Sequence, residues 1–393
     1  MKLPRAVFVA AAGLLAWTYA VFPALLLLRG RVRPRPFATA DIEPTVSVIV
    51  AAHDEQAAIG ERLDNLLALD YPAARLEIVV ASDGSTDRTV ALARLREPLV
   101  RVLDLPRVGK AAALGAAVAE TRGEILVFTD ANSAYKRDAV RRLVRPFADP
   151  SVGGVAGNQV YLPPSAPREG SAAGERGYWN ADRLFKTAES AAGSVVSATG
   201  AIYAIRRELF SPVHDDVSDD FHETLAVIDA GRRFVFAADA IALEPVAASS
   251  DREFDRKVRV MIRGLRCVGR WRRLTDPRRT GFFALELVTR KVLMRTMAVP
   301  LLALLGSSVA LARRSRLARL LALGQFAGYG MGLAGLVLER RRGHAPRLLA
   351  LPAYFSLVQV ASLVASWRIL RGRRIDRWEP ARQPASDDLE RAA

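Results

Sequence analysis

The first 28 residues form an almost uninterrupted hydrophobic stretch. Ala6 to Leu28 is a run of 23 residues without a charged side chain. The hydrocarbon core of a bilayer needs roughly 20 such residues at the rise of an α-helix. A cleaved signal peptide is the alternative, because Lys2 and Arg5 precede the run. The run is long and ends in four leucines without a small-residue cleavage site, so we predict a retained transmembrane helix over residues 1–28.

The C-terminal third of the chain becomes apolar again. We expect transmembrane helices within 296–370, with candidate spans at 296–312, 317–338 and 348–367, and a polar tail over 371–393. The number of spans stays open, because three arginines lie in a connecting loop whichever side it faces. These arginines are Arg313, Arg314 and Arg316.

The middle of the chain alternates between short β-branched runs and helical patterns. Strands are expected at 46–52, 76–82, 99–103 and 124–129. Helices are expected at 55–69 and 109–120, and another helix follows Asp87 and ends at Leu95. Strand–helix alternation at this spacing is typical of βαβ units, so we predict an α/β fold with a parallel sheet.

Acidic side chains follow three of these expected strands. Asp54 and Glu55 come after the first strand, Asp83 after the second and Asp130 after the fourth. Open parallel sheets bind ligands outside the carboxyl ends of their strands, so these positions suit a nucleotide and a divalent cation. The alternative is that these residues are turn and N-cap formers. The chain has no Gly-x-Gly-x-x-Gly after a strand and no Walker lysine motif, which disfavours dinucleotide and P-loop folds.

Charge and composition narrow the possibilities further. Lys and Arg outnumber Asp and Glu by 57 to 41, giving a net charge of +16, and the chain has one cysteine and four histidines. The single cysteine excludes an internal disulfide framework and a multi-cysteine zinc site, and four histidines disfavour a histidine-rich metal centre. A non-enzymatic protein that binds anionic lipid or nucleic acid is compatible with this charge. Most of the excess arginine lies beside the hydrophobic segments, where membrane topology explains it, so we expect membrane lipids and no nucleic acid as partners.

Four short motifs occur in the order and spacing seen in family 2 glycosyltransferases. They are Ser47–Glu55, Val80–Asp87, Gly109–Ala117 and Phe128–Asn132. With the flanking hydrophobic segments, the chain resembles the membrane-anchored, inverting members of that family, similar to bacterial polysaccharide synthases. The resemblance implies a Rossmann-like GT-A domain over 46–245.

The resemblance also implies roles for individual residues. Glu55 and Asp83 would contact the base and ribose of a nucleotide-sugar donor, and Lys110 would lie near its diphosphate. Asp130 stands at the metal-binding Asp-x-Asp position and would bind Mg²⁺ or Mn²⁺. The third residue of that motif is Asn132 here, whose neutral carbonyl oxygen is a weaker ligand than a carboxylate.

The expected general base is Asp220. It is the second acid of a Ser218–Phe221 segment that stands where the family has a Glu-Asp or Asp-Asp pair. Inverting transfer needs a group that removes the proton of the acceptor hydroxyl. We assign Asp219 to shaping the loop. The alternative is that both acids belong to a solvated loop that caps a helix.

Residues 246–295 are expected to form basic amphipathic helices at the membrane surface. Within them, Arg270 and Trp271 occupy the Arg-Trp part of the Gln-x-x-Arg-Trp motif of processive members, where they would contact donor and acceptor. Cys267 replaces the Gln, which puts processivity in doubt. An arginine on such a helix would otherwise contact lipid headgroups.

The sequence therefore predicts a membrane glycosyltransferase that acts on a polysaccharide or glycolipid acceptor. A non-processive enzyme that adds one sugar to a lipid carrier is the closest alternative, and a nucleotidyltransferase is a more distant one. The four arginines after the first hydrophobic run predict an inner-membrane protein whose catalytic domain is cytoplasmic. These arginines are Arg29, Arg31, Arg33 and Arg35.

Overall fold

The computed structural model describes residues 2–162, 171–244, 250–342 and 346–372; the polar tail expected over 371–393 therefore lies almost wholly outside the described residues. The chain forms two compact units. The sheet unit comprises Gly30–Ser165 and Arg183–Val246, and the helical unit comprises Met1–Arg29, Ala166–Asp182 and Ala247–Ile375. Each unit is described below by itself.

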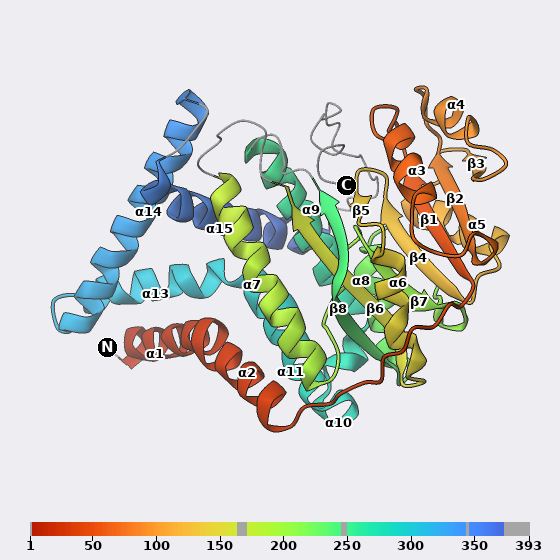
Figure 1. Ribbon diagram of the computed structural model, residues 1–393. Helices are drawn as coiled ribbons and strands as arrows, with labels where there is room; N and C mark the ends of the chain where they lie inside the picture. The colour runs from red at the N-terminus through yellow and green to blue at the C-terminus, as the bar shows by residue number, and fades with distance from the viewer. Residues whose placement is uncertain (1, 163–170, 245–249, 343–345, 373–393) are drawn as a thin grey trace. The chain divides into compact units, whose positions relative to one another are not determined.

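The sheet unit is built on an eight-stranded mixed β-sheet (Figure 1). The strand order is β3-β2-β1-β4-β7-β6-β8-β5, and the first four of these run parallel. Strand β7 is antiparallel to both β4 and β6, and β5 is antiparallel to β8. The strands are β1 (Val46–Ala52), β2 (Leu76–Asp83), β3 (Arg101–Leu105), β4 (Ile125–Asp130), β5 (Ala134–Tyr135), β6 (Val152–Tyr161), β7 (Tyr203–Arg206) and β8 (Arg233–Glu244).

Both faces of this sheet are covered, which explains why its central strands are mostly apolar and buried. All seven residues of β1 are buried, as expected for a parallel strand between two layers of helices. One hydrophobic cluster contains Val48, Val50 and Ile59, and a second cluster on the other face contains Ile49 and Leu114. The helices of this unit are α3 (Ile59–Leu67), α4 (Thr89–Arg94), α5 (Lys110–Glu120), α6 (Ala139–Val144) and α8 (Asp219–Asp229).

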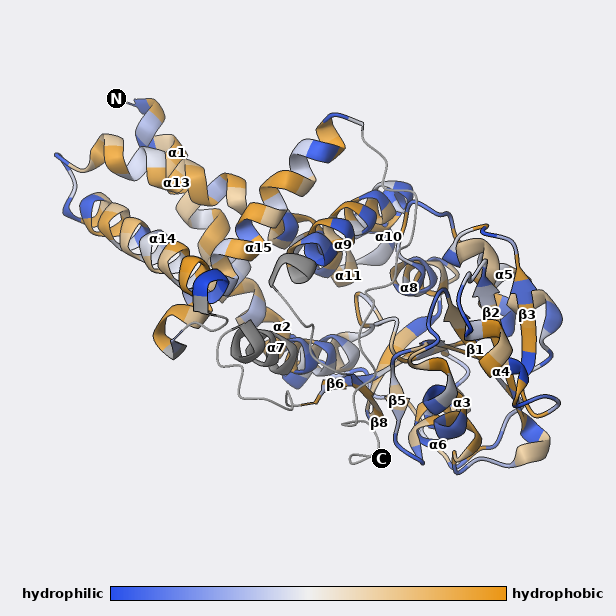
Figure 2. Cartoon of the chain, turned by 90° about the horizontal axis from the view of Figure 1, so that it is seen from above, coloured by the Kyte–Doolittle hydropathy of each residue, from blue (hydrophilic) through white to orange (hydrophobic). Residues whose placement is uncertain are grey.

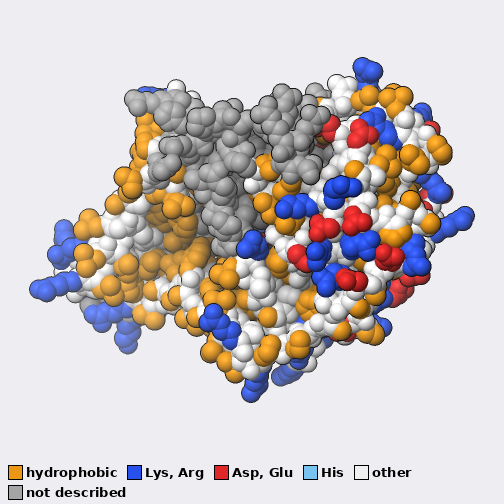
Figure 3. All heavy atoms as spheres, viewed as in Figure 1, with side chains coloured by type: hydrophobic (Ala, Val, Ile, Leu, Met, Phe, Trp, Pro, Cys, Tyr) orange, Lys and Arg blue, Asp and Glu red, His pale blue; other side chains and the backbone are white. Residues whose placement is uncertain are grey.

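The α/β fold expected from the sequence is confirmed. The first expected strand coincides with β1, and the next three agree with β2, β3 and β4 to within two residues at each end. The other half of the sheet, β5 to β8, in which β6 and β8 pair in parallel, was not predicted. Figure 3 shows basic and acidic side chains interspersed over the face of this unit that is in view, as on a surface that meets water.

The helical unit contains the hydrophobic ends of the chain (Figure 2). Among the residues that the structure describes, three helices are long and apolar enough to cross a membrane: Lys2–Val32, Arg316–Arg341 and Leu348–Leu370. The pair Phe282–Thr296 and Ala298–Leu311 is bent by 60° and gives a fourth span if it crosses as one broken helix. The number of spans therefore depends on this bent pair.

Packing inside the helical unit joins the amphipathic helix α9 to the last long helix α15. Val258 and Ile262 of α9 pack against Ala361 and Ala365 of α15. The helical elements are α1 (Lys2–Ala16), α2 (Phe22–Val32), α7 (Ser171–Ala192, shared with the sheet unit), α9 (Ser250–Arg270), α10 (Pro277–Thr280), α11 (Phe282–Leu287), α12 (Met294–Thr296), α13 (Ala298–Leu311), α14 (Arg316–Arg342) and α15 (Arg347–Leu370). Short π-helical segments, Trp17–Val21 and Val288–Leu293, join α1 to α2 and α11 to α12.

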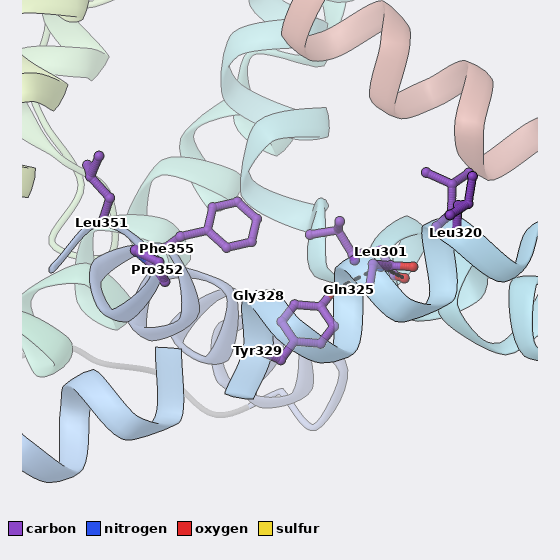
Figure 4. Close-up of a pocket in the computed structure, with 10 residues that line it drawn as sticks. Leu301, Leu320, Gln325, Gly328, Tyr329, Leu351, Pro352 and Phe355 are labelled. Carbon is purple, nitrogen blue, oxygen red and sulfur yellow. Dashed lines mark hydrogen bonds between the residues drawn. The ribbon is translucent and has the colours of Figure 1, made fainter. Parts of the chain in front are cut away.

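A cavity of about 500 Å³ lies among α13, α14 and α15 (Figure 4). Its wall is apolar apart from Gln325 and the hydroxyl of Tyr329. The Gln325 side-chain amide donates hydrogen bonds of 3.1 Å to the Leu301 carbonyl oxygen and of 3.1 Å to the Tyr329 hydroxyl. This amide links α14 to α13, as polar side chains do between helices in a bilayer.

Candidate active site

The acidic residues that follow the parallel strands meet at one edge of the sheet. Strands β2, β1 and β4 are neighbours, and Ala51 of β1 is in register with Asp130 at the end of β4. Asp83 is the last residue of β2, and Glu55 follows β1 by three residues. The structure therefore brings together three of the residues singled out in the sequence, at the edge where open α/β sheets bind ligands.

Lys110 is the central charge of this edge. Its ammonium nitrogen lies 2.8 Å from Oδ1 of Asp130 and 3.2 Å from Oδ2 of Asp219, and only 11% of its side chain is exposed. Burial by itself lowers the pKa of Lys110, but the carboxylates of Asp130, Asp219 and Asp220 outweigh it and hold the pKa well above its ordinary value. Lys110 is therefore a fixed positive charge at any physiological pH.

The loop that presents Lys110 is held by Asp83. Oδ1 of Asp83 accepts hydrogen bonds from the backbone amides of Val108 (2.7 Å) and Gly109 (2.8 Å). Its Oδ2 lies 2.8 Å from the guanidinium of Arg107. Asp83 is 1% exposed, so both carboxylate oxygens serve to fix residues 107–109. A direct contact between Asp83 and the ribose stays a prediction.

Glycine is required where this loop meets β2. Gly84 has φ +60°, and a Cβ at this position would lie 2.7 Å from the backbone nitrogen of Arg107. A larger residue would therefore be strained and would also push the loop away. The Asp83-Gly84 pair keeps the Lys110 loop against the end of the strand.

Glu55 titrates near neutral pH. Burial is the main cause, and the charges of Asp130, Asp87 and Asp54 add to it, so that the pKa of Glu55 rises to about 7. Its backbone amide donates a 2.7 Å hydrogen bond to the hydroxyl of Thr89, which ties the loop after β1 to the start of α4. A group with a pKa near the working pH is common at functional sites.

The Asp130 carboxylate is partly exposed, and the space beside it is narrow. Its side chain is one-third exposed, and a Cβ at Gly200 would lie 2.9 Å from its Oδ2. Glycine at position 200 therefore leaves room beside this carboxylate. Among the described residues, no three His, Cys, Asp or Glu side chains form a group that could hold a metal ion.

Asp130 and Asn132 suit a cation that binds together with the phosphates of a nucleotide. Mg²⁺ and similar ions in such sites use one or two protein carboxylates, with phosphate oxygens and water completing the shell. Asp130 can supply the carboxylate, and Asn132 a carbonyl oxygen. The residues present are too few for a cation held by the protein alone.

The two candidate acids begin helix α8. Asp219 and Asp220 are its first two residues, after Ser218 as N-cap. Carboxylates are favoured there by the helix dipole. The expectation that these acids cap a helix is thus compatible with the structure, but Asp219 also contacts Lys110. Oδ1 of Asp220 accepts a 2.8 Å hydrogen bond from the amide of Phe221.

The sequence of the sheet unit matches a known family. The model of the family described as Glycosyl transferase family 2 matches residues 47–213. The chain carries a family 2 glycosyltransferase domain. A solved mannosyltransferase from Pyrobaculum calidifontis, in complex with GDP-Man and Mn²⁺, shares the fold over 93% of this chain and 99% of its own, with a TM-score of 0.69 and 25% identity. The GT-A fold expected from the sequence is thereby confirmed.

Curated relatives of this chain include enzymes of different names. A β-monoglucosyldiacylglycerol synthase from Synechocystis is 39% identical over 28% of this chain and 24% of its own length. An N-acetylglucosaminyltransferase from Rhizobium is 26% identical over 61% of this chain and 57% of its own length. The chain therefore spans only part of the length of these relatives, and its substrates are treated as proposals.

Two of the predicted site residues, Arg270 and Trp271, belong to the helical unit. Arg270 is the last residue of α9, and Trp271 follows it. The Trp271 amide donates a 3.0 Å hydrogen bond to the carbonyl oxygen of Cys267, and the Arg273 guanidinium lies 5.0 Å from the centre of the Trp271 ring. Their role at the nucleotide stays a prediction.

Sequence patterns alone did not identify some of the groups around Lys110. Asp219 was expected only to shape a loop, whereas it forms an ion pair with Lys110. Tyr203 and Glu223 were not considered, although both are fully buried polar residues of this unit. A charged residue such as Glu223, one helical turn after the paired acids, could have indicated a second polar layer.

Proposed function

We propose that this glycosyltransferase is anchored in a membrane and moves a sugar, with inversion, from a nucleoside diphosphate sugar to a hydroxyl of a lipid-linked or polysaccharide acceptor. Glu55, Asp83 and Lys110 bind the donor, Asp130 binds a divalent cation and Asp220 is the general base.

One observation carries this proposal: Lys110 lies between Asp130 and Asp219 at the carboxyl end of the parallel strands. A buried ammonium beside a carboxylate that can bind a metal is the arrangement that attracts a diphosphate. Glu55, whose pKa is raised to about 7, contributes at the same edge. Asp220 follows Asp219 directly, which supports a base beside the diphosphate site.

The reaction follows from these groups. Asp220 takes the proton of the acceptor hydroxyl, and the hydroxyl oxygen bonds to the anomeric carbon on the face opposite the diphosphate. The bond from that carbon to the diphosphate oxygen breaks, and a nucleoside diphosphate leaves with the electron pair. Lys110 offsets the negative charge that grows on the leaving diphosphate.

A divalent cation fits the Asp130 side of this site. When bound, it would act as a Lewis acid on the diphosphate. Asp130 would hold it, with Asn132 as a weaker neutral ligand. The Mn²⁺ in the Pyrobaculum mannosyltransferase structure supports this assignment.

The acceptor is the least constrained part of the proposal. Similarity to a β-monoglucosyldiacylglycerol synthase favours a lipid acceptor, and Cys267 in place of Gln is compatible with an enzyme that adds a single sugar. Similarity to an N-acetylglucosaminyltransferase, whose name gives the transferred sugar and not the acceptor, leaves the polysaccharide acceptor as the second candidate. Product size separates the two, because a processive enzyme makes a polymer.

Anchoring and orientation follow from the hydrophobic ends. The helix Lys2–Val32 is long and apolar enough to span a membrane, and four arginines lie near its end. We propose that the sheet unit faces the cytoplasm, since positively charged flanks remain there.

Purified membranes containing the full chain would be incubated with a panel of nucleotide sugars and Mg²⁺ or Mn²⁺. The proposal predicts that at least one donor releases a nucleoside diphosphate in step with sugar transfer. Release of pyrophosphate would indicate the nucleotidyltransferase alternative, and no turnover of any donor would contradict the proposal.

A further inference from the structure

A buried polar layer lies next to the ion pair of Lys110 and Asp219. Tyr203 of β7 is 0% exposed, and its ring stacks on Phe128 of β4 with 4.9 Å between ring centres. Its hydroxyl is buried and has no hydrogen-bond partner within the described part of the chain. A buried hydroxyl without a partner costs free energy, so its position requires an explanation.

Glu223 is the second member of this layer. It is 0% exposed, and its Oε2 accepts a 3.3 Å hydrogen bond from the amide of Ser211. Its Oε1 is buried without a partner among the residues that the structure describes. An ionised carboxylate in this position would be very costly, whereas a protonated one could donate a hydrogen bond from Oε1.

Asp219 is the neighbour that these two residues share. Asp219 and Glu223 are four residues apart on α8, so their side chains lie on one face of the helix. Burial raises the pKa of both Tyr203 and Glu223 well above their ordinary values, and Asp219 is the charge that raises both further. Both shifts favour the protonated, neutral form of the side chain, which can donate a hydrogen bond.

We propose that Tyr203 and Glu223 are positioning residues that donate hydrogen bonds to the Asp219 carboxylate and so hold the first turn of α8, with Asp220, in place during the reaction. This inference rests on the proposed function, in which Lys110 turns toward a diphosphate. Asp219 then loses the ammonium as its partner, and two neutral donors can replace it.

The anchoring of α8 supports this role. The Thr224 hydroxyl donates a 2.7 Å hydrogen bond to the carbonyl oxygen of Asp220 and accepts a 3.1 Å hydrogen bond from the amide of Ala198. One side of the first turn is thus held independently of Lys110, and Asp219 on the same turn forms the ion pair with Lys110. A shift of Asp219 would therefore move Asp220, and a misplaced base slows transfer without weakening donor binding.

The test uses four variants of the full-length protein: Tyr203→Phe, Glu223→Gln, Glu223→Leu and, as a control, Tyr71→Phe. Tyr71 is also buried, but its hydroxyl donates to the carbonyl oxygen of Pro44, away from the site. Transfer rate at saturating donor and donor dissociation constant are measured for each.

Loss of a hydrogen bond to a charged group should lower kcat about tenfold in Tyr203→Phe and in Glu223→Leu, with donor affinity within about twofold. Glu223→Gln keeps a neutral donor and should retain kcat within about threefold, as should Tyr71→Phe. The proposal is overturned if Glu223→Gln loses as much as Glu223→Leu, or if Tyr203→Phe behaves like Tyr71→Phe.

Thermal unfolding gives a readout that does not depend on transfer. Because the pKa of Glu223 is raised in the folded state, wild type should lose stability relative to Glu223→Gln as pH rises from about 5 to 8. A difference that stays constant with pH would overturn the neutral state of Glu223, whereas a wild type that is inert with every donor would contradict only the proposed function.

Discussion

The ammonium of Lys110 lies 2.8 Å from Oδ1 of Asp130, so the carboxylate proposed to bind the cation is already paired with a positive charge. A divalent cation and a diphosphate together can replace this pair, because the cation takes Asp130 and the diphosphate takes Lys110. Donor and cation should therefore bind cooperatively, and neither should bind tightly alone.

We predict that Asp130→Ala abolishes transfer and the dependence of nucleotide binding on Mg²⁺ or Mn²⁺. Asn132→Ala should have a smaller effect, since an amide oxygen is a weaker ligand for these cations than a carboxylate. Titration of a nucleoside diphosphate with and without Mn²⁺ measures both. Unchanged metal dependence in Asp130→Ala would show that the metal assignment is wrong.

Donor affinity should rise with pH around neutrality. Glu55 has a pKa of about 7 and is largely protonated at pH 6, whereas hydrogen bonds from a base or ribose favour the carboxylate. Affinity should increase between pH 6 and 8, by at most about tenfold per pH unit. Dissociation constants of wild type and Glu55→Gln across this range test it, and equal slopes would exclude Glu55 as the titrating group.

The raised pKa of Glu55 should also make the free energy of unfolding depend on pH, in the opposite direction to donor affinity. The pKa of Glu55 is higher in the folded protein than its ordinary value of 4.5, so the folded state binds more protons between these values. The free energy of unfolding should therefore fall as pH rises from about 4.5 to 7, and Glu55→Gln should remove this part of the dependence. Thermal unfolding midpoints in the absence of nucleotide measure it.

Gly200→Ala should damage the site while the fold persists. The new Cβ would lie 2.9 Å from Oδ2 of Asp130, and crowding of this kind costs about 1–3 kcal/mol. Metal-dependent donor binding should weaken about tenfold or more. Gly115→Ala on α5 is the matched control, because its Cβ meets no atom within 4 Å. Similar donor affinities for the two variants would contradict the close approach.

Topology can be tested with a cysteine placed on the sheet unit. Ser151 is exposed, and the native Cys267 is buried. Ser151→Cys should react with a membrane-impermeant thiol reagent in inverted vesicles and remain unlabelled in intact cells. Wild type reports labelling of Cys267. Labelling of Ser151→Cys from outside intact cells would reverse the proposed orientation.

The parallel half of the sheet could be predicted because each of its strands and connecting helices is visible in a short stretch of sequence. Runs such as Val46–Ala52 are buried throughout, are apolar apart from Ser47, and are followed by a helical pattern. The strand and the connection after it can therefore be recognised from one stretch of sequence. The other half of the sheet depends on pairing between distant segments: β4 pairs antiparallel with β7, and β6 pairs parallel with β8. No short window of sequence contains that information, so these strands were missed.

The motif residues of the candidate site could be predicted from the sequence, but the residues that contact them could not. Asp83, Lys110 and Asp130 were recognised by motif, and the fold brings them to one edge. Their partners were not, because contacts such as that between Lys110 and Asp219 join residues 109 positions apart. The burial of Glu223 likewise depends on the sheet against which α8 packs.

The role of Asp220 offers the most direct test of the proposed reaction. Asn has nearly the same size as Asp but cannot accept the proton of the acceptor hydroxyl at neutral pH. Sugar transfer and donor affinity would be measured side by side for wild type, Asp220→Asn and Asp219→Asn. Transfer should fall by about 10²–10⁴ in Asp220→Asn with donor binding retained, and much less in Asp219→Asn. Transfer that survives in Asp220→Asn, whether Asp219→Asn loses it or not, would contradict the assignment of Asp220 as the base.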